Sequence, residues 1–221
     1  MTRSVLALLL AAPLTSALAA EPNEEAPPPA PGPRTYQLDA SQSALAVLVK
    51  YDRGALVAGH DHIVQASTFT GTVVWDPSDP TACAIQIGFP VDALVVDPPG
   101  SRDRAGIEGT TPESDKAKIK SNLSGRSQLD AAKFPSIDFK SSSCTPKGDR
   151  FDVSGTLTMH GVGAPVTASM KITADEETFA ASGSFTADHS AWSFKPFTAV
   201  MGALRNDPNL GFTIDVKGAT E

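Results

Sequence analysis

The chain has 221 residues, of which 41% are hydrophobic, and it carries a formal net charge of −7 at pH 7. This acidic balance argues against nucleic acid and against anionic membrane surfaces as electrostatic partners. The length is enough for one large domain with a substantial core, and the sequence shows no internal repeat.

The N-terminal segment has the pattern of a cleaved secretory signal. Arg3 precedes an apolar stretch at 5–12, and small residues follow in an Ala17-x-Ala19 arrangement. We therefore predict a signal peptide at residues 1–20. Its apolar run is too short to span a bilayer and no second long run follows, so we expect a soluble periplasmic or secreted protein without stable membrane insertion.

A linker is predicted at residues 21–34, which contain six prolines, three acidic residues and no aromatic residue. Such a segment favours a stiff, extended polyproline II conformation over packing into a core. We therefore expect the folded domain to occupy residues 35–221.

The first half of this domain is predicted to be mainly β-strand, because its apolar residues alternate with polar ones at a period near two. The expected strands lie at 36–39, 43–52, 67–76 and 84–96. The rhythm breaks between residues 97 and 135, where Ile119 and Leu123 have helical i, i+4 spacing. A helix from Lys116 to Leu129 is expected to cover one opening of the fold.

Period-two alternation returns after the helix, with strands expected at 136–144, 151–159, 165–172, 178–187, 190–194 and 210–218. This pattern predicts an all-β fold, an antiparallel up-and-down β-barrel of about eight strands with one short helical insertion. A barrel of this size can be filled by its own side chains or can hold one small ligand, and the pattern leaves both alternatives open.

Cys83 and Cys144 are the only cysteines in the chain. In an exported protein they are expected to form a disulfide, and two cysteines allow only one internal pairing. The alternatives are two separate buried thiols or a bridge between two chains. Antiparallel neighbouring strands would bring the start of the Cys83 strand beside the end of the Cys144 strand.

The segment AGHDHIV at 58–64 places His60 and His62 two residues apart, on one side of an extended chain. We expect this segment to be the entry to the strand that carries Phe69, Val73 and Trp75. Three roles are open for the pair: hydrogen bonds to the backbone of their own turn, which we favour, a clamp for a polar head group, or a metal site. Because Zn²⁺ usually needs three or four protein ligands, a metal would also require Asp61, His160 or His189.

Signals of catalysis are weak. The chain has neither a G-x-S-x-G elbow nor an H-E-x-x-H motif. Asp188, His189 and Ser190 are triad residue types, but neighbours along a strand point to opposite faces and cannot form a Ser-His-Asp relay. We expect no enzyme activity, no catalytic residue, no cofactor and no resident metal.

Three segments together resemble the YceI family of exported, lipocalin-like lipid-binding proteins. They are YQLDASQSALAVLVKYD at 36–52, SNLSGRSQLDAAKFPSIDFKSSS at 121–143 and VSGTLTMHGVGAPVTASMKI at 153–172. The GHDH motif and the segment FKPFTAVMGALRNDPNLGFTIDV resemble a subgroup of this family. The resemblance implies a barrel whose interior binds a polyisoprenoid, an isoprenoid quinone or a fatty acid derivative. It implies no catalysis, and it also makes a homodimer plausible.

The expected ligand is therefore an amphiphilic lipid whose tail contacts inward apolar side chains, and His60 and His62 are the candidates for contact with its head group. The expected tail contacts are Leu45, Val47, Val49, Phe69, Val73, Ile85, Ile87, Phe89, Phe139, Leu157, Met159 and Phe185. Two other classes of function remain as alternatives. One is an exported metal-binding or stress-response protein that uses His60 and His62, and the other is a protein-interaction module that binds no lipid.

Overall fold

The computed structural model describes residues 32–220. The predicted signal peptide and most of the predicted linker lie outside the described residues. The first strand begins at Arg34.

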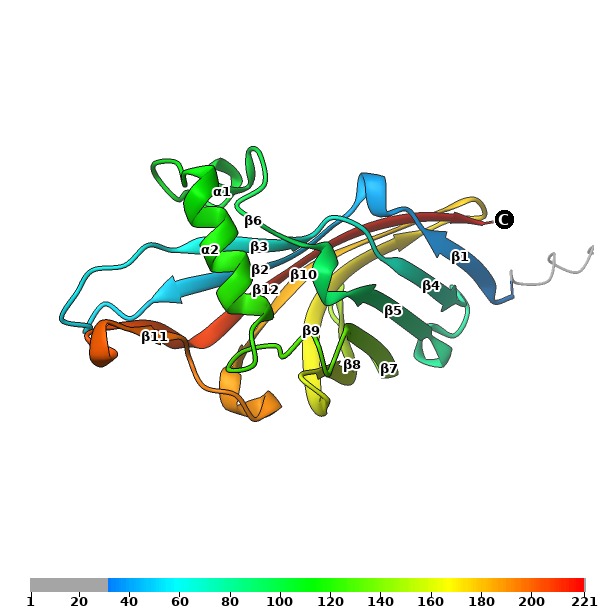
Figure 1. The fold of residues 1–221 in the computed structure, drawn as a ribbon. Coiled ribbons are helices and arrows are strands. Elements are labelled where there is room, and N and C mark those ends of the chain that lie inside the picture. Colours follow the sequence, from blue (N-terminus) through cyan, green and yellow to red (C-terminus); the bar gives the residue numbers. More distant parts are fainter. Residues whose placement is uncertain (1–31, 221) are drawn as a thin grey trace, which may run out of the picture. The chain divides into compact units, whose positions relative to one another are not determined.

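The described chain is built mainly from antiparallel strands, with two α-helices and several short 3₁₀ turns (Figure 1). The strands are β1 Arg34–Leu38, β2 Ala44–Tyr51, β3 His62–Ala66, β4 Thr70–Trp75, β5 Ala84–Pro90, β6 Leu94–Val96, β7 Ser136–Lys147, β8 Arg150–Met159, β9 Val162–Ala174, β10 Thr178–Asp188, β11 Thr198–Ala199 and β12 Leu204–Thr220. The helices are α1 Ser101–Arg104 and α2 Glu113–Ser124, and the 3₁₀ turns are η1 Ala40–Gln42, η2 Pro80–Ala82, η3 Val91–Ala93, η4 His189–Trp192 and η5 Val200–Gly202.

Eight strands form a closed ring in the order β1-β4-β5-β7-β8-β9-β10-β12, and β12 pairs with β1 to close it. The predicted antiparallel barrel of about eight strands is confirmed. Closure depends on the length of β12, which spans 17 residues. Its C-terminal end pairs with β1 through Gly218–Thr220, whereas Asn206–Asp215 pair with β2. One strand therefore serves both the closed ring and an extension made of β2, β3 and β6.

The sequence suggested that the segment AGHDHIV leads directly into the strand that carries Val73 and Trp75. This prediction is wrong. Residues 62–66 form a separate strand, β3, which pairs with β2 on one side and β6 on the other. Residues 67–69 lie between β3 and β4, and the Ser67 N–H donates to the carbonyl of Ala93 there.

The helical insertion is present, but α2 runs from Glu113 to Ser124 and not from Lys116 to Leu129. Beyond Gly125 the chain turns back on the helix, since the Leu129 N–H donates to the carbonyl of Leu123. The helix packs beside β6, where the Lys120 ammonium donates to the carbonyls of Asp92 and Leu94. The one-turn helix α1 was not predicted.

The expected strand at 190–194 is wrong, because this segment forms the 3₁₀ turn η4. The Asp188 side chain accepts a hydrogen bond from the Ser190 N–H and so caps the turn. Trp192 is fully buried, and its indole N–H donates to the carbonyl of Leu157 at 2.8 Å. The apolar residues of this segment therefore reach the core from a turn.

The β8–β9 hairpin turns at His160 and Gly161, whose φ angles are 52° and 72°. Two consecutive positive φ values match the twist of a hairpin, and glycine adopts them without strain. A Cβ on Gly161 would also lie 2.2 Å from the Phe134 ring. The turn and its close packing explain why glycine occupies this position.

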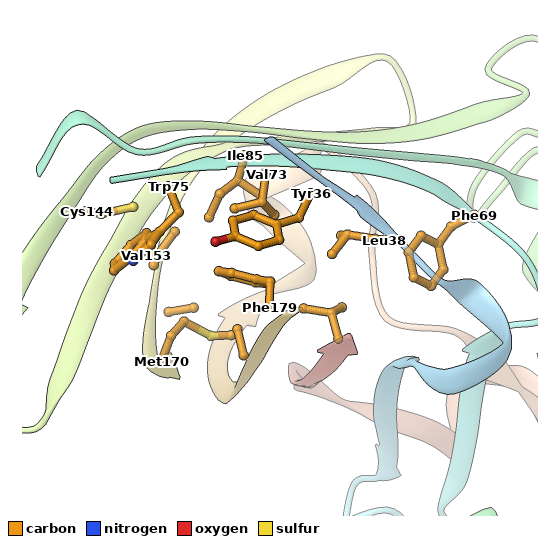
Figure 2. Close-up of a cluster of buried hydrophobic side chains, with 13 residues drawn as sticks. Tyr36, Leu38, Phe69, Val73, Trp75, Ile85, Cys144, Val153, Met170 and Phe179 are labelled. Carbon is orange, nitrogen blue, oxygen red and sulfur yellow. The ribbon is translucent and has the colours of Figure 1, made fainter. Parts of the chain in front are cut away.

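One end of the barrel is filled by a cluster of buried side chains to which all eight ring strands contribute (Figure 2). The Tyr36 and Phe179 rings pack at a centroid distance of 5.5 Å, and the Tyr36 hydroxyl donates to the carbonyl of Asp175 at 2.6 Å. Cys83 and Cys144 form the predicted disulfide beside this cluster, with their Cα atoms 6.0 Å apart. We call this region the closed end.

Candidate functional site: an apolar cavity in the barrel

The barrel contains a cavity of about 500 Å³ whose wall is almost entirely apolar. The lining begins at the closed end with Leu38, Val73 and Phe179, and it extends to Phe197 and Leu204 beyond the ring. Since Leu204 and Val216 of β12 both line it, the cavity follows this strand for roughly 40 Å. Small-molecule pockets usually measure about 300 to 1,000 Å³, so the volume suits one elongated ligand.

All but one of the expected tail contacts line this cavity: Leu45, Val47, Val49, Val73, Ile85, Ile87, Phe89, Phe139, Leu157, Met159 and Phe185. They converge because alternate residues of each strand point to the same face of the sheet. Phe69 is the exception. It precedes β4 and is buried in the cluster at the closed end, so it belongs to the solid core and not to the cavity wall.

The largest group that was not named among the tail contacts comes from β12, where Leu210, Phe212, Ile214 and Val216 all line the cavity. The Phe212 ring stacks on Phe185 with a centroid distance of 4.3 Å and an interplanar angle of 3°. The signal was available in the sequence, because these four residues alternate at period two. Ile119 and Leu123, whose i, i+4 spacing predicted the helix, also line the cavity from α2.

His62 lies at the cavity wall with its side chain mostly buried. Its ring is bonded to the Asp97 carboxylate, with Nδ1 and Oδ2 2.8 Å apart, and not to the backbone of its own turn as we expected. An ionised carboxylate can only accept hydrogen bonds, so Nδ1–H is the donor. In the neutral ring Nε2 is then the acceptor and remains available to a ligand.

Asp97 is buried, with only 3% of its surface exposed, and four groups donate to its carboxylate. They are the His62 ring, the Ile63 N–H, the Arg102 guanidinium and the Thr111 hydroxyl, at 2.6 to 3.2 Å. Burial by itself would raise the pKa of this carboxyl, but the hydrogen bonds from His62, Thr111 and Ile63 outweigh it and hold the pKa below its usual range.

Arg102 links this network to the loop that follows β6. Its guanidinium donates to the carbonyls of Asp61, Glu108 and Gly109, as well as to Asp97. The long segment between β6 and α2 is therefore held against the start of β3. The sequence did not reveal the pairing, because Asp97 and His62 are 35 positions apart and no local pattern connects them.

His60 is exposed and also lines the cavity, so it lies at an opening. Its ring centroid is 6.5 Å from that of His62. The other expected metal ligands bind elsewhere: the Nδ1 atoms of His160 and His189 contact the carbonyls of Trp192 and Pro208. Within residues 32–220, no group of three or more His, Cys, Asp or Glu side chains is arranged to hold a metal ion.

The Asp188-His189-Ser190 trio does not form a relay. Asp188 accepts from the Ser190 backbone N–H, while the His189 Nδ1–H donates to the Pro208 carbonyl at 2.6 Å. Burial lowers the pKa of the His189 imidazole below its usual value, against smaller opposite effects of Pro208, Asp188 and Asp207. The three side chains therefore have separate structural roles.

Comparison with known families gives one match over nearly the whole folded domain. The model of the YceI-like domain matches residues 36–217. The chain belongs to the YceI family. A closed β-barrel with an apolar interior, as seen here, is of a ligand-binding type and fits a small hydrophobic ligand.

Curated relatives match in part. A UPF0312 protein of Yersinia pestis (strain Pestoides F) is 37% identical over 67 residues, which is 30% of this chain and 35% of the relative. Protein YceI of Salmonella arizonae is 27% identical over 104 residues, 47% of this chain and 45% of the relative. The chain thus spans less than half the length of these curated relatives.

Two solved structures share the fold. The crystal structure of Burkholderia cenocepacia BcnA has a TM-score of 0.60 at 16% identity and covers 81% of this chain and 98% of its own. The Campylobacter jejuni YCEI protein has a TM-score of 0.55 at 12% identity and covers 75% of this chain and 87% of its own. In the described part of this chain, none of the helices is both long and apolar enough to cross a membrane.

Proposed function

We propose that this protein is exported and carries a long-chain apolar ligand, such as a polyisoprenoid, an isoprenoid quinone or a fatty acid derivative, inside its barrel. The observation that supports the proposal is the long apolar cavity of about 500 Å³. Export to the periplasm or the exterior is supported by the signal-like pattern of residues 1–20 and by the disulfide between Cys83 and Cys144.

The energetics of an empty cavity favour occupation. The wall is almost entirely apolar, and covering apolar surface with an apolar ligand contributes about 25 cal/mol per Å² removed from water. Water is a poor filler, because it needs polar partners and the wall offers few.

An alkyl or isoprenoid chain fills such a space favourably. Each buried methylene contributes about 0.8 kcal/mol, so ten of them give roughly 8 kcal/mol before entropy losses, near micromolar affinity. No catalytic group is required for this role. Elongation along β12 suits an extended chain better than a compact ring system.

His60 and His62 are proposed to contact the polar head group. Because Asp97 accepts the Nδ1–H of His62, the other ring nitrogen, Nε2, is left to contact the head group. The exposed His60 would lie closer to solvent, at the opening. This arrangement places polar groups at one end of an apolar cavity, as ligand sites usually do.

The direct test is native mass spectrometry of protein secreted by its natural route and purified without detergent, followed by organic extraction. We expect a bound amphiphile near one molecule per chain. After delipidation the melting temperature should fall, and readdition of the extracted lipid should restore it. The proposal would be contradicted if the purified protein contained no ligand and its melting temperature were the same before and after organic extraction.

A further inference from the structure

Two uncharged loops meet beyond the ring. Residues 54–59, between β2 and β3, and residues 196–203, around β11 and η5, contain no Asp, Glu, Lys or Arg. The Val57 N–H donates to the carbonyl of Ala203 at 2.9 Å, so the loops are joined. In Figure 1 they lie at the end of the sheet extension, remote from β1. We call the two loops together the apolar tip.

The exposed large hydrophobic side chains are concentrated there. In the described part of the chain they are Leu56 (92% exposed), Val57 (38%), Val200 (60%), Met201 (105%) and Val95 (38%). All except Val95 belong to the apolar tip. Single exposed apolar residues are ordinary, but four in two adjoining loops indicate an interaction site.

The backbone of the tip is strained where it exposes these side chains. Val200 and Met201 both have φ of 52°, followed by Gly202 at 87°. Positive φ is unfavourable for a β-branched residue such as valine, and strain of this kind concentrates at functional positions. Both residues are well exposed, so burial within this chain does not compensate for the strain.

Charged residues at the base of the tip are paired with one another. Arg53 binds Asp61 at 2.6 Å, and Arg205 binds Asp52 at 2.5 Å. The tip therefore presents an apolar surface with no excess charge from these four residues. Such a surface suits a zwitterionic partner better than an anionic one.

The two loops adjoin the rim of the cavity. Ala58 and Gly59 of one loop and Phe197 of the other line the cavity, as do His60 and Leu204, the residues that directly follow the two loops. A long-chain apolar ligand is scarcely soluble in water and resides in bilayers, so a carrier must exchange it with a membrane.

We propose that the apolar tip docks reversibly on a phospholipid bilayer and that the ligand passes between bilayer and cavity at its rim. This inference rests on the proposed carrier function. A second copy of the chain is a less suitable partner. A standard interface buries about 800 Å² per partner, and the exposed area of four side chains, two of which are only partly exposed, is smaller than that. Shallow insertion of a few apolar side chains needs no such area.

The test compares the mature wild-type chain with the double variant Leu56→Glu/Met201→Glu. Flotation with probe-free phosphatidylcholine vesicles measures docking, and vesicles loaded with a pyrene-labelled long-chain fatty acid measure transfer into the protein. We expect vesicle binding and transfer rate to fall about tenfold or more in the variant, because two apolar side chains are replaced by charges. Affinity for the same probe without vesicles should be unchanged.

The matched control is Ser142→Glu/Thr173→Glu, which adds the same charge at exposed positions on β7 and β9. It should bind vesicles and transfer the probe like the wild type. The inference would be overturned if the tip variant bound vesicles and took up the probe as well as the wild type does. It would also be overturned if the wild type were a dimer, the tip variant were a monomer, and both took up the probe at the same rate. If the wild-type protein does not bind the fatty-acid probe in the absence of vesicles, the proposed carrier function is contradicted. Flotation with probe-free vesicles does not depend on that result and tests membrane docking by itself.

Discussion

The most specific test of the carrier function introduces a bulky side chain on the cavity-facing side of one strand, β2. Val47 lies in the middle of β2 and lines the cavity, beside Phe212 on β12 and Val64 on β3. Its neighbour Leu48 pairs with Gly211 and Ile63 and does not belong to the lining. The substitutions Val47→Trp and Leu48→Trp therefore add the same indole on opposite faces of one strand.

The expected loss of affinity follows from the space that the indole occupies. Relative to valine, tryptophan adds about seven heavy atoms, and at about 0.8 kcal/mol per displaced methylene the upper limit is roughly 6 kcal/mol. If the ligand shifts and recovers half of this, about 3 kcal/mol remains, equivalent to roughly 100-fold weaker binding. Leu48→Trp should change the affinity less than about threefold, because no ligand atom is displaced.

The assay is a fluorescence titration of delipidated protein with the pyrene-labelled fatty acid, together with thermal unfolding of each variant. Since Val47 faces empty space, Val47→Trp should unfold within about 1 kcal/mol of the delipidated wild type, whereas overpacking a filled core costs about 1 to 3 kcal/mol. Undiminished binding by Val47→Trp would refute the reasoning. A strongly destabilised variant would also refute it, because it would show that the barrel is filled by its own side chains.

Three predictions concern the scaffold around the cavity. The double variant Cys83→Ser/Cys144→Ser opens a loop of 61 residues and should lower the free energy of unfolding by about 4 kcal/mol in urea titrations, and an unchanged midpoint would contradict this. His189 has a lowered pKa, so the folded state resists its protonation, and stability should be lost as pH falls below about 6.5. His189→Gln should flatten the dependence of melting temperature on pH between pH 7 and 5, and an equally steep dependence would exclude His189 as its source. Asp97→Asn should destabilise by about 3 kcal/mol at neutral pH, because Arg102 loses its buried partner. The difference from wild type should shrink as pH falls through the lowered pKa of Asp97, and a constant difference down to acid unfolding would argue against the ionised network.

The network around Asp97 shows where reasoning from local pattern stops. His62 was recognised as a site residue because histidines are few in this chain and two are close together. Its partner Asp97 lies in a Gly- and Pro-rich segment whose composition indicates only a loop. The two residues meet because β3 pairs with β6, a tertiary contact that neither segment encodes alone.

One error in the predicted elements has a related cause. The segment 190–194 contains alternating apolar residues, and alternation reports which side chains become buried more reliably than it reports backbone conformation. In 190–194, Trp192 is buried as the pattern implied, but it is carried by a capped 3₁₀ turn. Between residues 58 and 75, two separate strands replace the expected continuous entry, because β3 belongs to the extension and β4 to the ring.

The sequence by itself determined the strand-rich antiparallel barrel, the single disulfide and eleven of the residues that line the cavity. Side-chain direction alternates strictly along a strand, so inward residues such as Val47 and Ile87 can be identified from period two alone. Only the tertiary structure decided that the barrel is hollow, that His62 binds Asp97 and that two uncharged loops adjoin at the rim. Alternation reveals which face is apolar, but the space between facing walls depends on strand curvature and on the two-sided pairing of β12. These are distances between segments far apart in the chain, and they exist only once the chain has folded.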